Sequence, residues 1–163
     1  MVQVAMPTRP DGPVLDQADI LPTDAETMIE AQLTRLGGVS GDALVVVSVE
    51  SLKGERIEDY AFTLFNTWGI GDAATDRGLL VLVAPNERKV RIEVGCGLES
   101  TISDDLAADI IQKRMLPEFR QGDFAAGVQA GVDALIERME LPQPANDPGP
   151  HSVLCTADMR NAA

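Results

Sequence analysis

Chemically reactive side chains are scarce in this sequence. It has two cysteines, Cys96 and Cys155, and one histidine, His151. The two cysteines lack the CxxC spacing of a zinc site, and a single pair does not support a disulfide framework. His151 lies in a proline-rich terminal segment, which offers no scaffold for a Ser-His or Cys-His pair. The residues therefore favour neither a zinc protein nor a hydrolase with a protein nucleophile.

Basic residues are also few, 13 against 26 acidic residues, which gives a formal net charge of −13. This charge repels phosphate backbones, so the chain is not expected to bind nucleic acid. It attracts cations instead, which suits metal ions and basic partners. Solubility is the plain alternative explanation, and the charge by itself does not decide between the two.

Long apolar runs and common catalytic motifs are missing. No apolar stretch approaches the ~20 residues of a membrane-spanning helix, so we expect no direct insertion into a membrane. The first residues show no signal peptide, and neither a phosphate loop nor a nucleophile elbow is present. Gly95-Cys96-Gly97 lacks the third glycine of a dinucleotide loop and is interpreted as a plain glycine turn. Within it, Cys96 is interpreted as a small packing residue rather than a reactive thiol.

Proline marks both ends of the chain. We predict that residues 1–12 form a disordered head and residues 142–163 a proline-rich disordered tail, because neither stretch has a periodic apolar face. The residues between them, 13–141, form one domain in this interpretation, with no internal repeat. A domain of this size buries a sizeable core without disulfides or a structural metal.

Helical periodicity recurs four times in this domain. The predicted helices follow a capping box at Thr23 and Glu26, the glycine at position 54, Ser103, and Asp123. We expect the first helix to end at Gly37-Gly38 and the third to end before Pro117. The expected buried face of the first helix consists of Ala25, Met28, Ile29, Leu33 and Leu36.

Three runs are too short for helices and are predicted to be strands, namely 44–49, 79–84 and 89–94. The last two are separated by the short turn Pro85-Asn86-Glu87, which predicts an antiparallel hairpin with one strand at or near a sheet edge. Alternation of helices and strands predicts an α/β fold, with helices on both faces of a mixed sheet.

Acidic residues gather near the ends of this hairpin. Asp72 and Asp76 precede its first strand, and Glu99 follows its second strand. The start of one strand of a hairpin neighbours the end of the other, so these carboxylates are expected to approach one another. Oxygen ligands without histidine or cysteine suit a hard cation, Ca²⁺ or Mg²⁺. The alternative is that these acids only form turns and remain solvated.

The pattern of conspicuous residues extends along the whole predicted domain. It consists of Val14 to Leu21, Tyr60 to Gly71, Asp76 with Gly78, Arg88 to Gly95, Gly97 to Glu99, and Pro117, Phe119, Gly122 and Phe124. These segments, in this order, resemble the TPM-domain family. That family includes thylakoid-lumen proteins associated with photosystem II repair and many bacterial envelope proteins.

The resemblance implies a three-layer α/β/α sandwich with a mixed sheet. It also implies a divalent-metal site, in which Asp76 and Glu99 are the first ligands by position and Asp72 is the next. Two departures stand out, because Cys96 replaces a common aromatic residue and Arg77 replaces a common Asn or Asp, so that its charge opposes cation binding. The resemblance implies a cell-envelope or periplasmic location, and without a visible signal peptide the cytoplasm stays an alternative.

Three functions are compatible with these observations. The first is a non-catalytic, metal-binding module that assists or docks on membrane-protein complexes in the cell envelope. The second, implied by the resemblance, is a weak acid phosphatase that depends on Ca²⁺ or Mg²⁺ and uses Arg88, Lys89 and Arg91 as nearby positive charge. We favour the simpler interpretation that these basic residues form the solvated face of an edge strand. The third is a structural domain whose acids only confer solubility.

Overall fold

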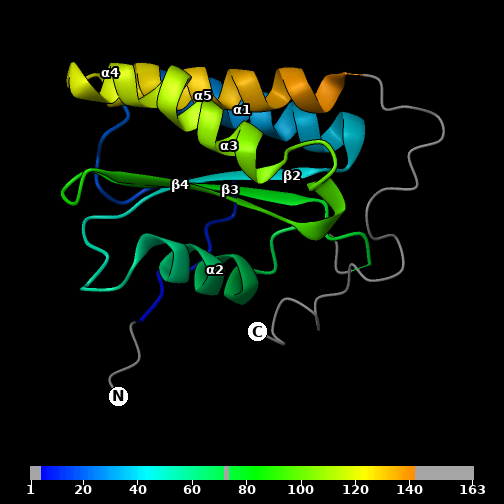
Figure 1. Cartoon of the computed structure of the whole chain (residues 1–163), viewed down its shortest axis with the longest axis horizontal. Helices are drawn as coiled ribbons and strands as arrows, with labels where there is room; N and C mark the ends of the chain where they lie inside the picture. Colours follow the sequence, from blue (N-terminus) through cyan, green and yellow to red (C-terminus); the bar gives the residue numbers. More distant parts are fainter. Residues whose placement is uncertain (1–4, 72–73, 142–163) are drawn as a thin grey trace.

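The computed structural model describes residues 5–71 and 74–141. Its centre is a four-stranded mixed sheet in the order β1-β2-β3-β4 (Figure 1). β1 (Val14–Asp16), β2 (Ala43–Ser48) and β3 (Gly78–Ala84) run parallel, and β4 (Lys89–Val94) is antiparallel to β3. The predicted hairpin with an edge strand is therefore confirmed.

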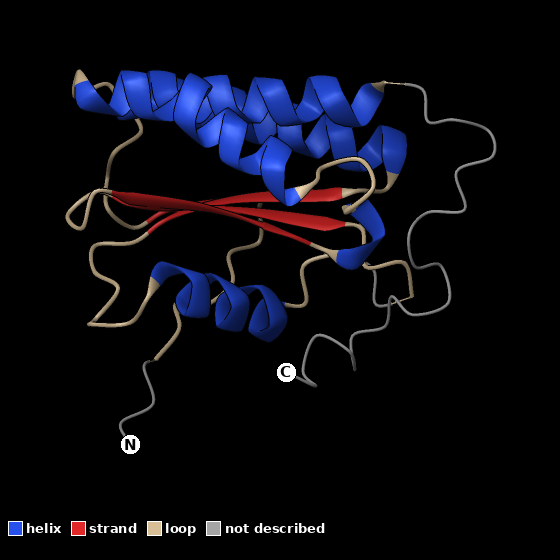
Figure 2. Ribbon diagram, in the orientation of Figure 1, coloured by secondary structure: helices blue, strands red, loops and turns tan. Residues whose placement is uncertain are grey.

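Helices cover both faces of the sheet (Figure 2). One face carries α1 (Thr23–Ser40), α3 (Asp104–Ile110), the π-helical turn η2 (Ile111–Met115), α4 (Leu116–Arg120) and α5 (Phe124–Glu140), while α2 (Ile57–Trp68) covers the other. The short 3₁₀ turn η1 (Cys96–Leu98) follows β4. This arrangement confirms the predicted three-layer α/β/α sandwich.

The sheet separates two hydrophobic clusters, one under each helical layer. Every residue of β3 is buried, and successive residues belong alternately to the two clusters, as the twofold period of a strand requires. Thus Leu79 and Val81 pack under α1 and α5, whereas Leu80 and Leu82 pack against α2. β3 is therefore the element on which both layers are built.

The first helix differs from its prediction at both ends. Pro22 precedes it and no side chain caps its first turn, so the predicted capping box at Thr23 and Glu26 is wrong. The helix continues through Gly37-Gly38 and stops at Gly41, which has φ 78°. A helical glycine costs only about 1 kcal/mol, which packing of the apolar face offsets. Met28 is also 61% exposed rather than buried.

The helical path after Ser103 also runs further than predicted. Ser103 caps α3 by accepting a hydrogen bond from the Leu106 N–H, as predicted. The path does not end before Pro117, because the wider π turn η2 leads directly into α4, where the proline sits in the first turn. A proline is tolerated there because the first N–H groups of a helix have no intrahelical partner.

The chain before the sheet is tied to α2. The Trp68 indole N–H donates to the Pro7 carbonyl at 2.9 Å, and the Arg9 guanidinium donates to the Trp68 carbonyl. Met6 packs against the cluster beneath α2. The prediction of a disordered head did not anticipate these contacts in residues 5–12. The predicted tail, 142–163, lies outside the described residues.

Asp16, at the end of β1, organises the junction with α1. Its carboxylate accepts hydrogen bonds from the N–H groups of Ile20 (3.0 Å) and Leu21 (2.8 Å) and from the Ser48 hydroxyl (2.6 Å). Partial burial, and then the neighbouring carboxylates of Asp16, Glu30 and Asp19, raise the pKa of Glu26 above its ordinary value of 4.5. Ionisation of the Glu26 carboxyl group is therefore less favourable in the folded state than in the unfolded state.

A Glu26→Gln substitution should raise the melting temperature at pH 7 and have less effect at pH 4. A carboxyl group whose pKa is raised by folding favours the folded state below its unfolded pKa, and this contribution is lost as the pH rises through the folded pKa. Melts across this pH range, with Glu140→Gln as an exposed control, measure the effect. An equal change at both pH values would contradict the assignment.

Candidate functional site

Two loops meet at one end of the β3–β4 hairpin. Leu79 pairs with Val94, so the residues before β3 and those after β4 lie at the same end of the sheet. The Gly95 N–H donates to the Gly78 carbonyl at 2.7 Å, and the Gly97 N–H donates to the Asp76 carbonyl at 3.0 Å. The predicted approach of the loop holding Asp76 to the segment 95–99 is confirmed.

Asp76 joins these loops through its side chain as well. It is 7% exposed, has φ 49°, and accepts a hydrogen bond from the Cys96 N–H at 2.8 Å through Oδ2. Asp tolerates the left-handed region better than most residues, and its carboxylate binds a nearby N–H strongly. Asp76 thus has a structural role whatever else it binds.

Two glycines permit this close packing of backbones. A Cβ built on Gly95 would lie 2.3 Å from the Asp76 carbonyl oxygen, and one on Gly97 would lie 2.0 Å from the Thr75 carbonyl oxygen. Real Cβ atoms do not approach oxygen so closely, so only glycine fits at either position. The glycines are therefore required by the protein's own backbone.

Arg77 is held by an ion pair that the sequence did not reveal. Its guanidinium donates to both oxygens of the Asp42 carboxylate, with Nε–Oδ1 at 2.6 Å and Nη2–Oδ2 at 3.1 Å. The Asp42 side chain is 2% exposed and that of Arg77 is 40% exposed. The guanidinium also donates to the Gly97 carbonyl at 3.1 Å. Arg77 therefore ties the start of β2 to the turn after β4.

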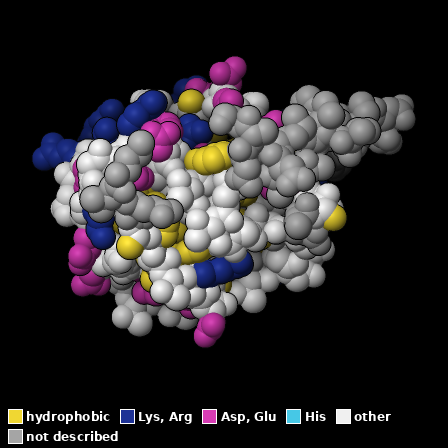
Figure 3. Space-filling model, turned by 90° about the horizontal axis from the view of Figure 1, so that it is seen from below, with side chains coloured by type: hydrophobic (Ala, Val, Ile, Leu, Met, Phe, Trp, Pro, Cys, Tyr) yellow, Lys and Arg dark blue, Asp and Glu magenta, His cyan; other side chains and the backbone are white. Residues whose placement is uncertain are grey.

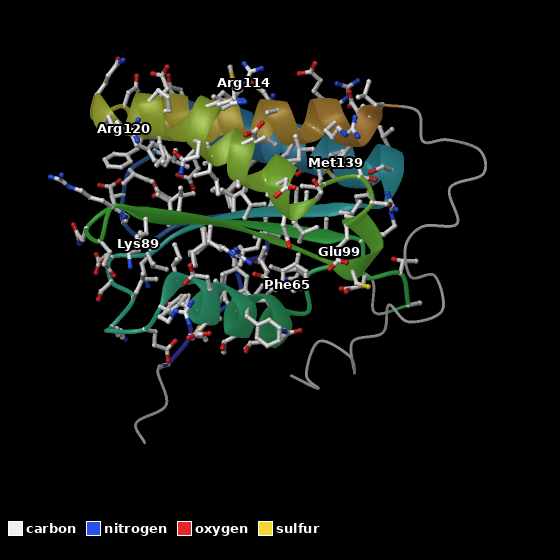
Figure 4. The ribbon with its side chains drawn as sticks, in the orientation of Figure 1. Phe65, Lys89, Glu99, Arg114, Arg120 and Met139 are labelled. Carbon is white, nitrogen blue, oxygen red and sulfur yellow. The ribbon has the colours of Figure 1, made fainter. Side chains whose placement is uncertain are left out.

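The three predicted metal ligands are placed unequally. Asp76 is buried at the junction, and Glu99 is exposed at the end of η1 (Figure 4). Asp72 lies outside the described residues. Within residues 5–71 and 74–141, no group of three or more His, Cys, Asp or Glu side chains is arranged to hold a metal ion. The described carboxylates alone therefore make an incomplete site.

The chemistry of the donors at this end nevertheless fits a hard cation. The two carboxylates bring only oxygen, and the backbone carbonyls of Gly95 and Gly97 belong to the turn between β4 and Glu99. These carbonyls already accept hydrogen bonds, from the Leu98 N–H at 2.9 Å and from Arg77. A carbonyl oxygen has a second lone pair, so each can accept one further interaction. Asp76, Glu99 and these carbonyls are the described atoms that would hold Ca²⁺ or Mg²⁺.

Cys96 is disulfide-bonded. This finding corrects the expectation of a free packing residue. Separation along the sequence does not reveal whether two sulfur atoms meet in space, because a bridge needs only Cα atoms within about 7 Å.

The basic residues of β4 do not all lie beside these acids. Lys89 pairs with Ala84 at the turn end of the hairpin, and Arg91 contacts Glu93 at 3.4 Å. With a rise of about 3.3 Å per residue, positions 89 and 94 are about 17 Å apart. Figure 4 shows Lys89 and Glu99 at opposite ends of the sheet. Arg88 and Lys89 are therefore too far away to share a phosphoryl group with a cation held by Glu99.

A family model for the TPM domain matches residues 14–138. The chain belongs to the TPM-domain family. This confirms the resemblance seen in the sequence. The comparison with curated proteins finds no match.

Solved structures give the same fold. The N-terminal domain of a protein from P. gingivalis superimposes with a TM-score of 0.74 and 32% identity, over 78% of this chain and 81% of that one. The N-terminal domain of cg2496 from Corynebacterium glutamicum has a TM-score of 0.64 and 18% identity, over 90% and 92% of the two chains. BA42 from Bizionia argentinensis has a TM-score of 0.62 and 20% identity, over 79% and 89%.

Among the residues that the structure describes, no helix of this TPM domain is long and apolar enough to cross a membrane.

Substitution of Arg77 by Gln should destabilise the domain by about 2 kcal/mol or more. It leaves the buried Asp42 carboxylate without its partner, and breaking a fully buried pair costs about 3–5 kcal/mol, so partial exposure of Arg77 lowers the figure. Urea unfolding measures the change. Lys113→Gln is the control, because its ion pair with Asp109 is exposed at both ends and should contribute less than about 1 kcal/mol. Equal effects would show that the Asp42 pair is not a structural tie.

Proposed function

We propose that this TPM domain is a non-catalytic binding module that holds a divalent cation, Ca²⁺ before Mg²⁺, at the end of the sheet with Asp76 and Glu99. The observation that supports this most is the junction itself, where the loop before β3 is hydrogen-bonded to the turn after β4. Hydrogen bonds hold the Asp76 carboxylate and the carbonyls of Gly95 and Gly97 in place there. Rigid oxygen donors reduce the entropy lost when a cation binds.

The charge of Arg77 does not oppose this proposal as strongly as the sequence suggests. Its guanidinium is engaged by both oxygens of Asp42, so the positive charge is largely neutralised locally. The guanidinium then acts as a brace that fixes the Gly97 carbonyl. The net charge of −13 also favours a cation over an anion at long range.

Docking on membrane-protein complexes in the cell envelope is the second half of the proposal. Ca²⁺ takes six to eight oxygen ligands, and the described residues supply only a few of them. The remaining positions are open to water or to oxygen atoms of a partner protein. Such a site suits a module that joins two proteins through a cation, with Asp72 as a further ligand.

Binding of Ca²⁺ should raise the melting temperature, because a ligand of the folded state at ~100-fold excess over its Kd adds about 2.7 kcal/mol. Mg²⁺ should have a smaller effect, since it gives up its waters reluctantly. Calorimetric titration should show weaker Ca²⁺ binding for Glu99→Gln and Asp76→Asn. Glu99→Gln is the cleaner variant, because Glu99 is exposed whereas Asp76 also holds the Cys96 N–H.

Asp109→Asn is the matched control, since it removes one exposed carboxylate from α3, outside the junction. It should bind Ca²⁺ as the unchanged protein does. Absence of Ca²⁺ and Mg²⁺ binding at millimolar concentration, or unchanged binding in both site variants, would refute the proposed cation site.

The alternative is a divalent-metal-dependent acid phosphatase, the activity that the resemblance to the TPM-domain family implies. It would share the cation site, but Arg88 and Lys89 lie at the other end of the hairpin and do not supply its positive charge. The guanidinium of Arg77 does lie at the junction, but it is already paired with Asp42.

We therefore expect hydrolysis of a generic phosphomonoester to be weak, and independent of a protein nucleophile. Cys96→Ser, Cys155→Ser and His151→Ala variants should each retain the rate of the unchanged protein. Phosphate release measured with and without Ca²⁺ or Mg²⁺ tests this. Loss of most of the activity in any one variant would establish nucleophilic catalysis instead.

A further inference from the structure

A cavity of about 580 Å³ lies at the opposite end of the sheet from the proposed cation site. It opens where β3 ends, between the turn that leads to β4 and the helices α4 and α5. Its volume falls within the range of about 300–1,000 Å³ that is common for small-molecule sites. The lining residues are Val83, Ala84, Pro85, Arg88, Lys89, Leu116, Phe119, Arg120, Gly122 and Phe124.

Three cationic side chains converge on this cavity from separate parts of the chain. Arg88 is in the turn, Lys89 begins β4, and Arg120 ends α4. No acidic side chain is among the described lining residues, and none of the three cations forms an ion pair within residues 5–71 and 74–141. In a chain with a net charge of −13, such a concentration of unpaired positive charge is unexpected from composition alone.

Two of these residues, Lys89 and Arg120, are labelled in Figure 4. Figure 4 shows Lys89 and Arg120 at the same end of the molecule, away from Glu99 and Arg114. Figure 3 shows basic side chains gathered at the left end of the view, the end that holds the turn after β3. Basic side chains are therefore concentrated at this end of the face that Figure 3 shows.

Aromatic rings supply the apolar part of the cavity. Phe119 and Phe124 lie with ring centroids 5.3 Å apart and planes inclined by 42°. Leu116 and Pro85 continue this apolar wall. The cavity thus combines a cationic rim with an aromatic wall, which suits a ligand with an anionic end and an apolar body.

Arg88 occupies its place at a conformational cost. It has φ 57°, in the left-handed region, where a side chain other than Gly, Asn or Asp is unfavourable. Glycine would fit this position of the turn without strain. A strained residue at the rim of a cavity is an observation from which a functional role can be inferred.

We propose that this cavity binds an organic phosphate and does not hydrolyse it. The phosphate group lies against Arg88, Lys89 and Arg120, and the apolar body lies on Phe119 and Phe124. A phosphate accepts more hydrogen bonds and carries more charge than a carboxylate, which matches three cations better than one. The described lining residues include no hydroxyl or thiol group that could act as a nucleophile. They also include no imidazole or carboxylate group that could bind a metal ion.

The test uses the full chain in EDTA, so that the proposed cation site plays no part and the two proposals fail separately. Calorimetric titrations compare phenyl phosphate, inorganic phosphate and phenol. Phenyl phosphate should bind about tenfold more tightly than inorganic phosphate, because only it reaches the aromatic wall, and phenol should bind more weakly still. Equal affinity for phenyl and inorganic phosphate would overturn the two-part site.

Variants separate a specific site from general attraction of charge. Arg120→Gln and Arg88→Gly should each weaken phenyl phosphate binding about tenfold or more. Arg114→Gln is the control, because it removes the same charge from the neighbouring η2 turn but does not line the cavity. Arg88→Gly should also leave stability unchanged or raise it, which separates loss of binding from loss of folding. Equal weakening in Arg114→Gln would overturn the proposal.

The phosphate group could belong to a lipid or to a free small molecule, and a further experiment distinguishes these two sources. Sedimentation with phosphatidylcholine vesicles, with and without phosphatidic acid, tests a lipid source against the free phenyl phosphate. Binding to either, lost in Arg120→Gln and kept in Arg114→Gln, supports the cavity and identifies the source. Binding to neither overturns it, as does phosphate release from phenyl phosphate that Arg120→Gln abolishes, because the cavity would then be catalytic.

Discussion

The register of β3 against β4 sets the separation between the two candidate sites of this domain. β3 is buried along its whole length and takes part in both hydrophobic clusters, so it cannot slide without exposing one of them. Its antiparallel partner β4 pairs with it from Leu79 to Ala84, and each end of the pair opens into a loop. One end receives Asp76, Arg77 and Glu99, and the other receives Arg88 and Lys89. Hydrophobic burial thus sets the separation of the acidic and basic groups.

Each end is completed by residues distant in sequence. Asp42, from the start of β2, meets Arg77 across 35 positions and fixes the junction of the acidic end. Arg120, from the end of α4, joins Arg88 and Lys89 around the cavity at the basic end. The sheet supplies the spacing, and the helical layer and the neighbouring strand supply the missing side chains. Both candidate sites are therefore products of the tertiary fold.

The parts of the fold that local patterns encode were predictable. The alternating residues of β4, the apolar run of β3 and the caps Ser103 and Asp123 depend on neighbours in sequence, and each was confirmed. β1 was not predicted, because its three residues carry too little periodicity.

The features that the sequence did not predict correctly share a physical origin. The helix through Gly37-Gly38 and the continuation past Pro117 occur because packing outweighs local propensity. Asp42 resembles an ordinary acid in a turn until the fold brings Arg77 to it. The three cations of the cavity likewise have no pattern in sequence, because a turn, a strand and a helix end bring them together. The position of Asp76 was predictable only because a hairpin brings its two loops together.

The distance between the two ends has an electrostatic consequence. Charges about 17 Å apart along a strand are separated by about two Debye lengths at physiological ionic strength, where one such length is about 8 Å. A cation at the acidic end therefore perturbs an anion at the basic end only weakly through solvent. Any coupling between the two would have to pass through β3 and β4, which are held rigidly by packing on both faces. The proposed cation site and the proposed phosphate cavity would therefore act independently of each other.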